Sequence, residues 1–277
     1  MKDYDYYSSF LTEGVNEKSL NIDKMSSIEI VKLINDDDKK IAYAVETQLE
    51  NIAKGIDLTA EKLKGDGRLI YIGAGTSGRL SVVDACEIPP TYGYTPEKVQ
   101  AILAGGNEAM FVSSEGGEDD PEEAINALRN INFTNDDVLF GMSASGSAKF
   151  VIGGLEYAKS IGALTISYSC REDSAISKIA DIPITVIVGP EIINGSTRMK
   201  AATAQKMVLT MFSTGVMVKL GRVRGNMMVY MNPANIKLVN RGIRIVMSQA
   251  NVDEDTARKS LEDNNWSIID AIDSLTY

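Results

Sequence analysis

Residues 69–80, LIYIGAGTSGRL, place an apolar run directly before a glycine-rich turn. Gly73, Gly75 and Gly78 have the spacing G-x-G-x-x-G, in which a tight turn joins a strand to a helix. A second stretch, VLFGMSASGSAKF at 138–150, repeats this plan, because its apolar run also ends in small and hydroxyl-bearing residues. The two stretches predict two strand–turn–helix units in one sheet.

Five short apolar, β-rich runs predict the strands of that sheet: RLIYIG, KVQAILAG, DVLFGM, ALTISYS and IPITVIVG. Helical segments or loops separate them at intervals that suit parallel crossovers. Such runs are apolar throughout, which is typical of strands buried on both faces. We therefore expect an α/β fold with a five-stranded parallel sheet sandwiched by helices.

Helical segments flank the predicted sheet. The periodicity from Ser27 onwards predicts two helices or one long broken helix, with Ser26 or Ser27 as N-cap and Gly65 and Gly67 as stops. Residues 197–221 predict a long apolar helix whose methionine-rich face packs in the core or against a second subunit.

The tail from about residue 236 differs in character. It predicts two short helices around Asn264 and Asn265, with Trp266 as a local anchor. We therefore expect a small helical subdomain at the C-terminus.

Composition narrows the class of function. The chain has 277 residues and a formal charge of −10, which argues against a nucleic-acid or membrane-surface binder. Cys86 and Cys170 make no disulfide framework and suit a reducing cytoplasm. The N-terminus lacks the apolar core of a signal peptide, and no run of eighteen apolar residues follows. We expect a soluble cytoplasmic protein.

The chain contains no histidine. A Ser-His-Asp triad and a histidine-based zinc site are therefore excluded, and acid–base chemistry falls to Asp, Glu, Lys, Tyr or Cys. We expect neither a metal nor a cofactor.

The glycine-rich turn fails the further tests for a nucleotide site. A dinucleotide fold needs an acidic residue about 20 positions later, at the end of the second strand. Here Glu97 precedes that strand, which ends in Ala104, Gly105 and Gly106. A P-loop is also excluded, because no Gly-Lys-Ser/Thr follows the glycines.

The hydroxyl groups of the two turns suggest a different ligand. Side chains and backbone N–H groups at two helix N-termini can surround one phosphate with neutral donors. The alternative is that these residues only form turns and helix caps. The repetition favours a phosphate site made by Gly75, Thr76, Ser77, Gly78, Ser143, Ser145 and Gly146.

Both turns resemble those of the sugar isomerase (SIS) family of phosphosugar-binding domains. Longer stretches resemble the N-acetylmuramic acid 6-phosphate etherase family over nearly the whole chain; they are residues 11–23, 68–93, 116–122, 189–209 and 232–246. The resemblance implies an N-terminal segment with helices at 1–60, a SIS domain at 61–230 and a C-terminal helical subdomain at 231–277. It also implies a homodimer with its site near the subunit interface.

The resemblance implies cleavage of the D-lactyl ether at C3 of the sugar, which gives N-acetylglucosamine 6-phosphate and D-lactate. In the open-chain form a base removes the C2 proton, an acid protonates the departing lactyl oxygen, and water then adds to the unsaturated aldehyde. By the same resemblance Glu87 is the acid and Glu118 the base, with Glu115 as a rival base. Without the resemblance, the acidic stretch 115–123 is a solvated loop that caps the next helix.

A third polar turn, around Gly195, adds Ser196, Thr197, Arg198 and Lys200 as candidates for binding a phosphate or carboxylate. The alternative is a helix N-cap with surface cations. The family usually has Ser-Gly-Arg-Thr-Pro where this chain has residues 145–149, SGSAK.

Two other functions remain open from the sequence: a non-catalytic phosphosugar-binding regulator like the glucokinase regulatory protein, and a phosphosugar isomerase. The presence of both Glu87 and Glu118 favours the etherase.

Overall fold

A five-stranded parallel sheet forms the centre of the molecule in the computed structural model, which describes residues 11–114 and 116–276. The strands have the order β2-β1-β3-β4-β5, and every neighbouring pair is parallel. They are β1 (Leu69–Gly73), β2 (Val99–Leu103), β3 (Val138–Met142), β4 (Leu164–Ser169) and β5 (Ile182–Thr185). All five strands expected from the apolar runs are confirmed.

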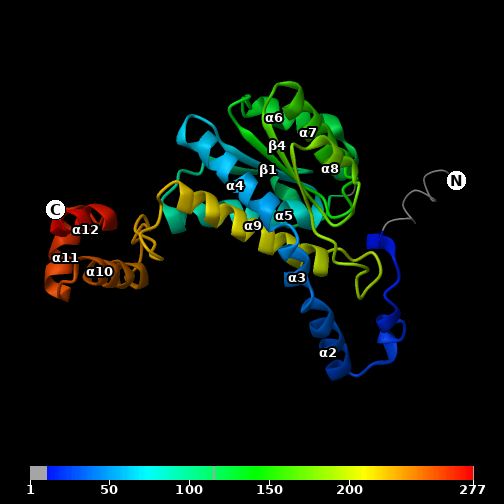
Figure 1. Ribbon diagram of the computed structural model, residues 1–277, viewed down its shortest axis with the longest axis horizontal. Coiled ribbons are helices and arrows are strands. Elements are labelled where there is room, and N and C mark those ends of the chain that lie inside the picture. Colours follow the sequence, from blue (N-terminus) through cyan, green and yellow to red (C-terminus); the bar gives the residue numbers. More distant parts are fainter. Residues whose placement is uncertain (1–10, 115, 277) are drawn as a thin grey trace.

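Helices cover both faces of the sheet (Figure 1). On one face lie α6 (Pro121–Asn130), α7 (Lys149–Ser160) and α8 (Ala175–Ile179); on the other lie α4 (Leu49–Lys64), α5 (Gly75–Tyr92) and α9 (Lys200–Lys219). Side chains alternate along each strand, so Tyr71 joins the α4–α5–α9 core while Ile72 joins the core on the other face. The double coverage explains why the strands are apolar throughout.

Three helices, in place of the expected one or two, lead into the sheet: α2 (Ser27–Asp38), α3 (Ile41–Glu46) and α4. Ser26 is the N-cap of α2, because its N–H donates to Glu29 Oε2 at 2.8 Å. Gly65 ends α4, as expected. Helix α4 packs on α9 and continues past residue 60.

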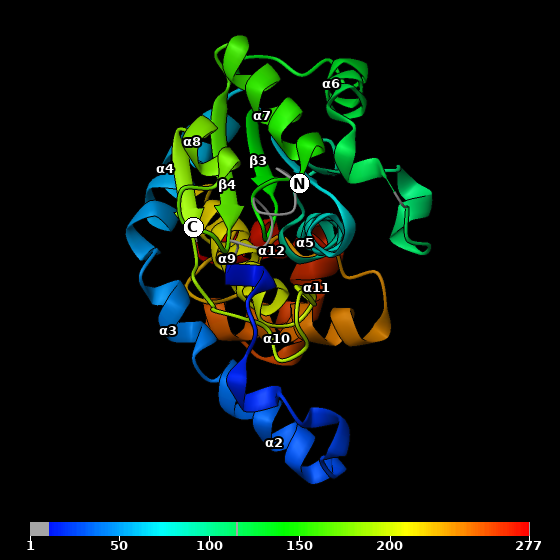
Figure 2. The same ribbon diagram turned by 90° about the vertical axis from the view of Figure 1, so that its right-hand side faces the viewer.

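Between residue 11 and α2 lie three single-turn 3-10 helices: η1 (Leu11–Glu13), η2 (Glu17–Ser19) and η3 (Ile22–Lys24). We call residues 11–24 the N-terminal strap. Figure 2 shows the strap beginning in front of α9 and running away from the sheet towards α2.

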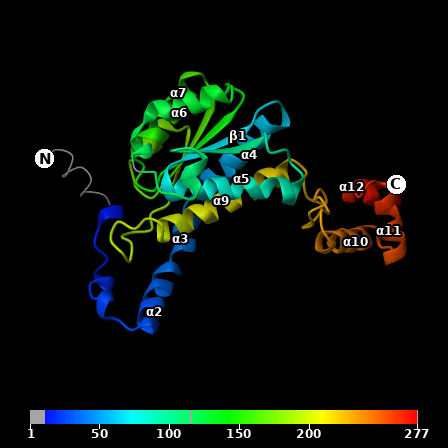
Figure 3. The same cartoon turned by 180° about the vertical axis from the view of Figure 1, so that it is seen from behind.

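The C-terminal helices α10 (Ile236–Ala250), α11 (Glu254–Asp263) and α12 (Ile268–Thr276) pack around an apolar cluster of their own. They lie at the opposite end of the molecule from the strap (Figure 3). The two short helices expected around Asn264 and Asn265 are confirmed as α11 and α12. Among the described residues, no helix has the length and apolar content needed to cross a membrane.

Candidate functional site

The two hydroxyl-rich turns lie side by side because β1 and β3 are neighbours in the sheet, with Gly73 opposite Met142. From β1 the chain crosses to β2 on one side, and from β3 it crosses to β4 on the other. The crevice outside the carboxyl ends of strands at such a reversal is the general ligand-binding place of open α/β sheets.

The turn after β1 requires a glycine at the point where α5 comes closest to β1. A Cβ on Gly78 would lie 2.5 Å from the carbonyl oxygen of Gly73, so α5 could not begin this close to β1 with a larger residue. The carbonyl of Ser77 accepts a hydrogen bond from Gln205 Nε2 of α9 at 2.8 Å. The first turn of α5, with Thr76 and Ser77, is thereby held with its N–H groups directed at the crevice.

The turn after β3 is built from linked hydroxyl groups. Ser143 Oγ accepts from the Gly146 N–H at 3.1 Å, and the hydroxyls of Ser145 and Ser147 are 2.8 Å apart. Gly146 has φ +67°, and a Cβ there would lie 2.3 Å from that of Ser174. Glycine is therefore required for this turn to fold back against the loop after β4.

Both turns line one cavity of about 290 Å³. The structure thus brings together seven of the residues proposed from the sequence: Gly75, Thr76, Ser77, Glu118, Ser143, Ser145 and Thr197. An adjoining cavity of about 350 Å³ shares Gly75 and Glu118 and extends towards Arg79.

Glu118 lies on the short η5 helix (Gly117–Asp119), immediately before α6. The ammonium group of Lys149, at the start of α7, is 3.2 Å from Asp119 Oδ1. This ion pair joins the acidic turn to the helix that follows the serine-rich turn. Glu115, the rival base, lies outside the described residues.

Glu87 is not among the residues that line either cavity. It is exposed on α5, ten residues beyond Ser77, which corresponds to about 15 Å along a helix. Within one chain, the structure does not bring Glu87 and Glu118 together.

Ser196, Arg198 and Lys200 also lie outside the cavity lining. The Lys200 side chain is buried, with Nζ 2.5 Å from Asp37 Oδ2 and 2.7 Å from the carbonyl oxygen of Pro190. Burial raises the pKa of Asp37, but hydrogen bonds from Lys200 and Lys40 outweigh it and hold that pKa below its ordinary value. Lys200 thus anchors the start of α9 to α2.

Sequence reasoning missed Glu13, which comes from the strap and lines the same cavity as Glu118. It lies some sixty residues before the first hydroxyl-rich turn, so no local spacing connects it with the site.

Asp84 is a second missed group. It receives hydrogen bonds from Tyr71 at 3.0 Å and Ser213 at 3.1 Å. Burial raises the pKa of Asp84 to about 6, although both hydrogen bonds oppose this.

In the described part of the chain, no three His, Cys, Asp or Glu side chains gather as metal ligands.

Comparison with known proteins places these features in a family. Residues 51–159 match the glucokinase regulatory protein N-terminal SIS domain, and residues 121–215 match the SIS domain. The chain is 52% identical over 257 residues to the N-acetylmuramic acid 6-phosphate etherase of Clostridium beijerinckii, covering 93% of this chain and 84% of that protein. This chain belongs to the N-acetylmuramic acid 6-phosphate etherase family.

Another member of the etherase family, from Lactobacillus gasseri, is 51% identical over 92% of this chain and 86% of its own length. Solved structures share the fold at lower identity. A putative phosphosugar isomerase from Bacteroides fragilis gives a TM-score of 0.53 at 18% identity, covering 72% of this chain and 98% of its own. A putative sugar-phosphate isomerase from Listeria monocytogenes gives 0.52 at 18% identity, covering 71% and 93%.

Proposed function

We propose that this chain cleaves the D-lactyl ether of N-acetylmuramic acid 6-phosphate by elimination and water addition, giving N-acetylglucosamine 6-phosphate and D-lactate. The observation that carries the proposal is the single cavity lined by both hydroxyl-rich turns and by Glu118. Membership of the etherase family supports the choice of substrate.

The phosphate is held between the first turn of α5 and the serine-rich turn after β3. Thr76, Ser77, Ser143 and Ser145 offer hydroxyl donors, and the N-terminus of α5 adds backbone N–H groups. Neutral donors suit this chain, because its net charge of −10 gives no general attraction for an anion.

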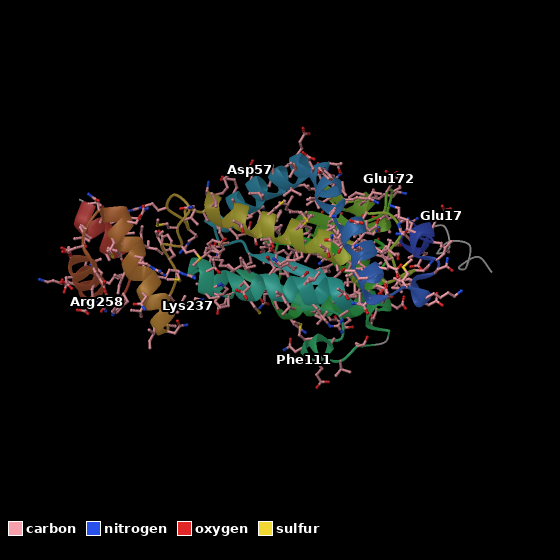
Figure 4. All side chains as sticks on the ribbon, turned by 90° about the horizontal axis from the view of Figure 1, so that it is seen from below. Glu17, Asp57, Phe111, Glu172, Lys237 and Arg258 are labelled. Carbon is pink, nitrogen blue, oxygen red and sulfur yellow. The ribbon has the colours of Figure 1, made fainter. Side chains whose placement is uncertain are left out.

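Glu118 is the base that removes the C2 proton, since it lies in the cavity beside the phosphate turns. Glu87 is the acid at the lactyl oxygen, and its exposed position on α5 suggests that it serves the site of a second copy. An apolar hollow of about 420 Å³ next to it, lined by α5 and β2 residues such as Val82 and Pro89, supports this homodimer. Figure 4 shows α5 and α9 side by side. Val83 of α5 is an exposed apolar side chain.

Lactate release from N-acetylmuramic acid 6-phosphate tests the function. We expect wild-type protein to release D-lactate, and we expect Glu118→Gln to abolish both release and exchange of the C2 proton with solvent. Wild-type protein that binds the sugar phosphate without releasing lactate would indicate the regulator class, which the SIS match at 51–159 also fits.

Mixing two inactive variants tests the shared site. If Glu87 of one copy serves Glu118 of the other, Glu87→Gln and Glu118→Gln chains should regain activity when subunits exchange. If the mixture stays inactive although mass spectrometry shows heterodimers, then either both carboxylates act within one chain or the assignment of Glu87 is rejected.

We also assign the reaction to the cytoplasm and to the recycling of cell-wall sugars. The free thiols of Cys86 and Cys170 are consistent with a reducing compartment.

A further inference from the structure

The N-terminal strap contributes a second described carboxylate to the substrate cavity. Glu13 lines that cavity together with Glu118, Thr76 and Ser143. Its Oε2 also lies only 3.1 Å from where a Cβ on Gly195 would be placed, so the carboxylate rests against the glycine turn before α9.

Hydrogen bonds at both ends of this part of the strap hold Glu13 in place. Asn194 Nδ2 donates to the carbonyl oxygens of Glu13 and Gly14, each at 3.2 Å. Asn16 Nδ2 donates to Asp37 Oδ2 at 3.1 Å and to the carbonyl of Pro190 at 3.3 Å. Because Asp37 is itself paired with buried Lys200, Asn16 ties the strap to the start of α9.

The chemistry of the substrate limits what a carboxylate can contact there. A carboxylate accepts hydrogen bonds, and a phosphate dianion has none to donate, so Glu13 must face the sugar. In the pyranose form of N-acetylmuramic acid 6-phosphate, O3 bears the lactyl group, O5 is the ring oxygen and O6 bears the phosphate. The free hydroxyls are those on C1 and C4.

The reaction also has a proton transfer that Glu118 and Glu87 do not cover. The C2 proton becomes acidic only in the open-chain aldehyde, so the ring must open first. Opening requires a base for the C1 hydroxyl and an acid for the ring oxygen. Since the chain lacks histidine, a carboxylate in the cavity is the fitting group for both transfers.

Resting on the function proposed above, we propose that Glu13 is a catalytic residue that opens the pyranose ring. Its carboxylate takes the proton of the C1 hydroxyl while the C1–O5 bond breaks and C1 becomes the aldehyde carbonyl. The electron pair of that bond stays on O5, which then receives the proton from Glu13. The carboxylate returns to its starting state, and Glu118 is free to remove the C2 proton.

Exchange between the two anomers of the product isolates this step, because anomers interconvert only by ring opening and closure. The probe is N-acetylglucosamine 6-phosphate, followed by NMR exchange spectroscopy with full-length protein. Wild-type protein and Glu118→Gln should both accelerate anomer exchange, whereas Glu13→Gln should slow it by about 10²-fold or more. Glu17→Gln is the matched control, because Glu17 is an exposed glutamate of the same strap (Figure 4) and is not among the residues that line the cavity.

Calorimetric titration with the product separates catalysis from binding. The proposal requires Glu13→Gln to bind the product as wild-type protein does while losing anomer exchange. Three results would each overturn the proposal. Glu13→Gln could keep wild-type anomer exchange, Glu118→Gln alone could lose anomer exchange, or Glu13→Gln could lose product binding. Failure of wild-type protein to release lactate while it still accelerates anomer exchange would reject the etherase function and leave the role of Glu13 standing.

Discussion

Replacing Asp84 by asparagine should change the stability of the protein in a pH-dependent way. The free energy of unfolding of the variant, minus that of wild type, should be higher at neutral pH than at acid pH. The Asp84 carboxyl connects three elements, since it accepts hydrogen bonds from Tyr71 of β1 and Ser213 of α9 and itself belongs to α5. Burial raises its pKa from 3.8 to about 6.

The size and sign of the effect follow from this pKa. The folded protein holds the Asp84 proton up to about pH 6, whereas the unfolded chain releases it near 3.8. The stabilisation from this group is therefore complete below about pH 4 and is lost as pH rises through about 6. A shift of roughly two pKa units corresponds to about 3 kcal/mol in the free energy of unfolding.

Urea unfolding followed by circular dichroism, at a series of values between about pH 4 and pH 8, measures this effect. We expect the free energy of unfolding of Asp84→Asn, minus that of wild type, to rise by about 3 kcal/mol across the series. Asp253→Asn is the control for which we expect a flat difference across this series, because the backbone N–H of Thr256 lowers the pKa of Asp253 below its ordinary 3.8 and its titration therefore lies below the measured range. A flat or falling difference for Asp84→Asn would refute the assignment of a buried, proton-holding carboxyl.

Three further substitutions test the architecture of the site. Lys200→Met leaves the buried Asp37 carboxylate without its buried partner and should lower the free energy of unfolding in urea by about 3 kcal/mol. Adding Asp37→Leu should restore most of this loss. A Lys200→Met variant as stable as wild type would contradict the reasoning. Gly146→Ala forces a Cβ to 2.3 Å from that of Ser174 and should weaken sugar-phosphate binding in calorimetric titration; unchanged affinity would show that the turn yields without moving its hydroxyls. Gly78→Ala sets a Cβ 2.5 Å from the carbonyl that ends β1 and should lower the melting temperature by several degrees, whereas an unchanged value would mean that α5 shifts freely.

The phosphate turns could be predicted from the sequence because their chemistry is local. An apolar run followed by glycine and hydroxyl residues specifies a strand, a turn and a helix N-terminus within about ten positions. Gly78 and Gly146 then mark where the backbone must approach closely or adopt positive φ. The repetition of that local pattern after β1 and β3 was enough to place Ser77 and Ser143 at one end of a parallel sheet.

The positions of charged groups could not be predicted in the same way. Lys200 follows a polar turn and looks available to an anion, yet the fold buries its ammonium group against Asp37. Glu87 follows the first hydroxyl-rich turn in the sequence, but it lies ten residues further along α5 and does not line the cavity. Glu13 has no local signal, and it reaches the cavity only because Asn16 and Asn194 fasten the strap there.

The sequence by itself determined the sheet, its turns and the class of ligand, because strand periodicity, glycine spacing and helix caps are decided by residues close together along the chain. The tertiary structure alone decided which carboxylates line the cavity. Contacts between segments separated by more than a hundred residues, such as that between Glu13 and the Gly195 turn, depend on how the end of α2 is joined to the start of α9 through Asp37 and Lys200, and no short-range pattern encodes that contact.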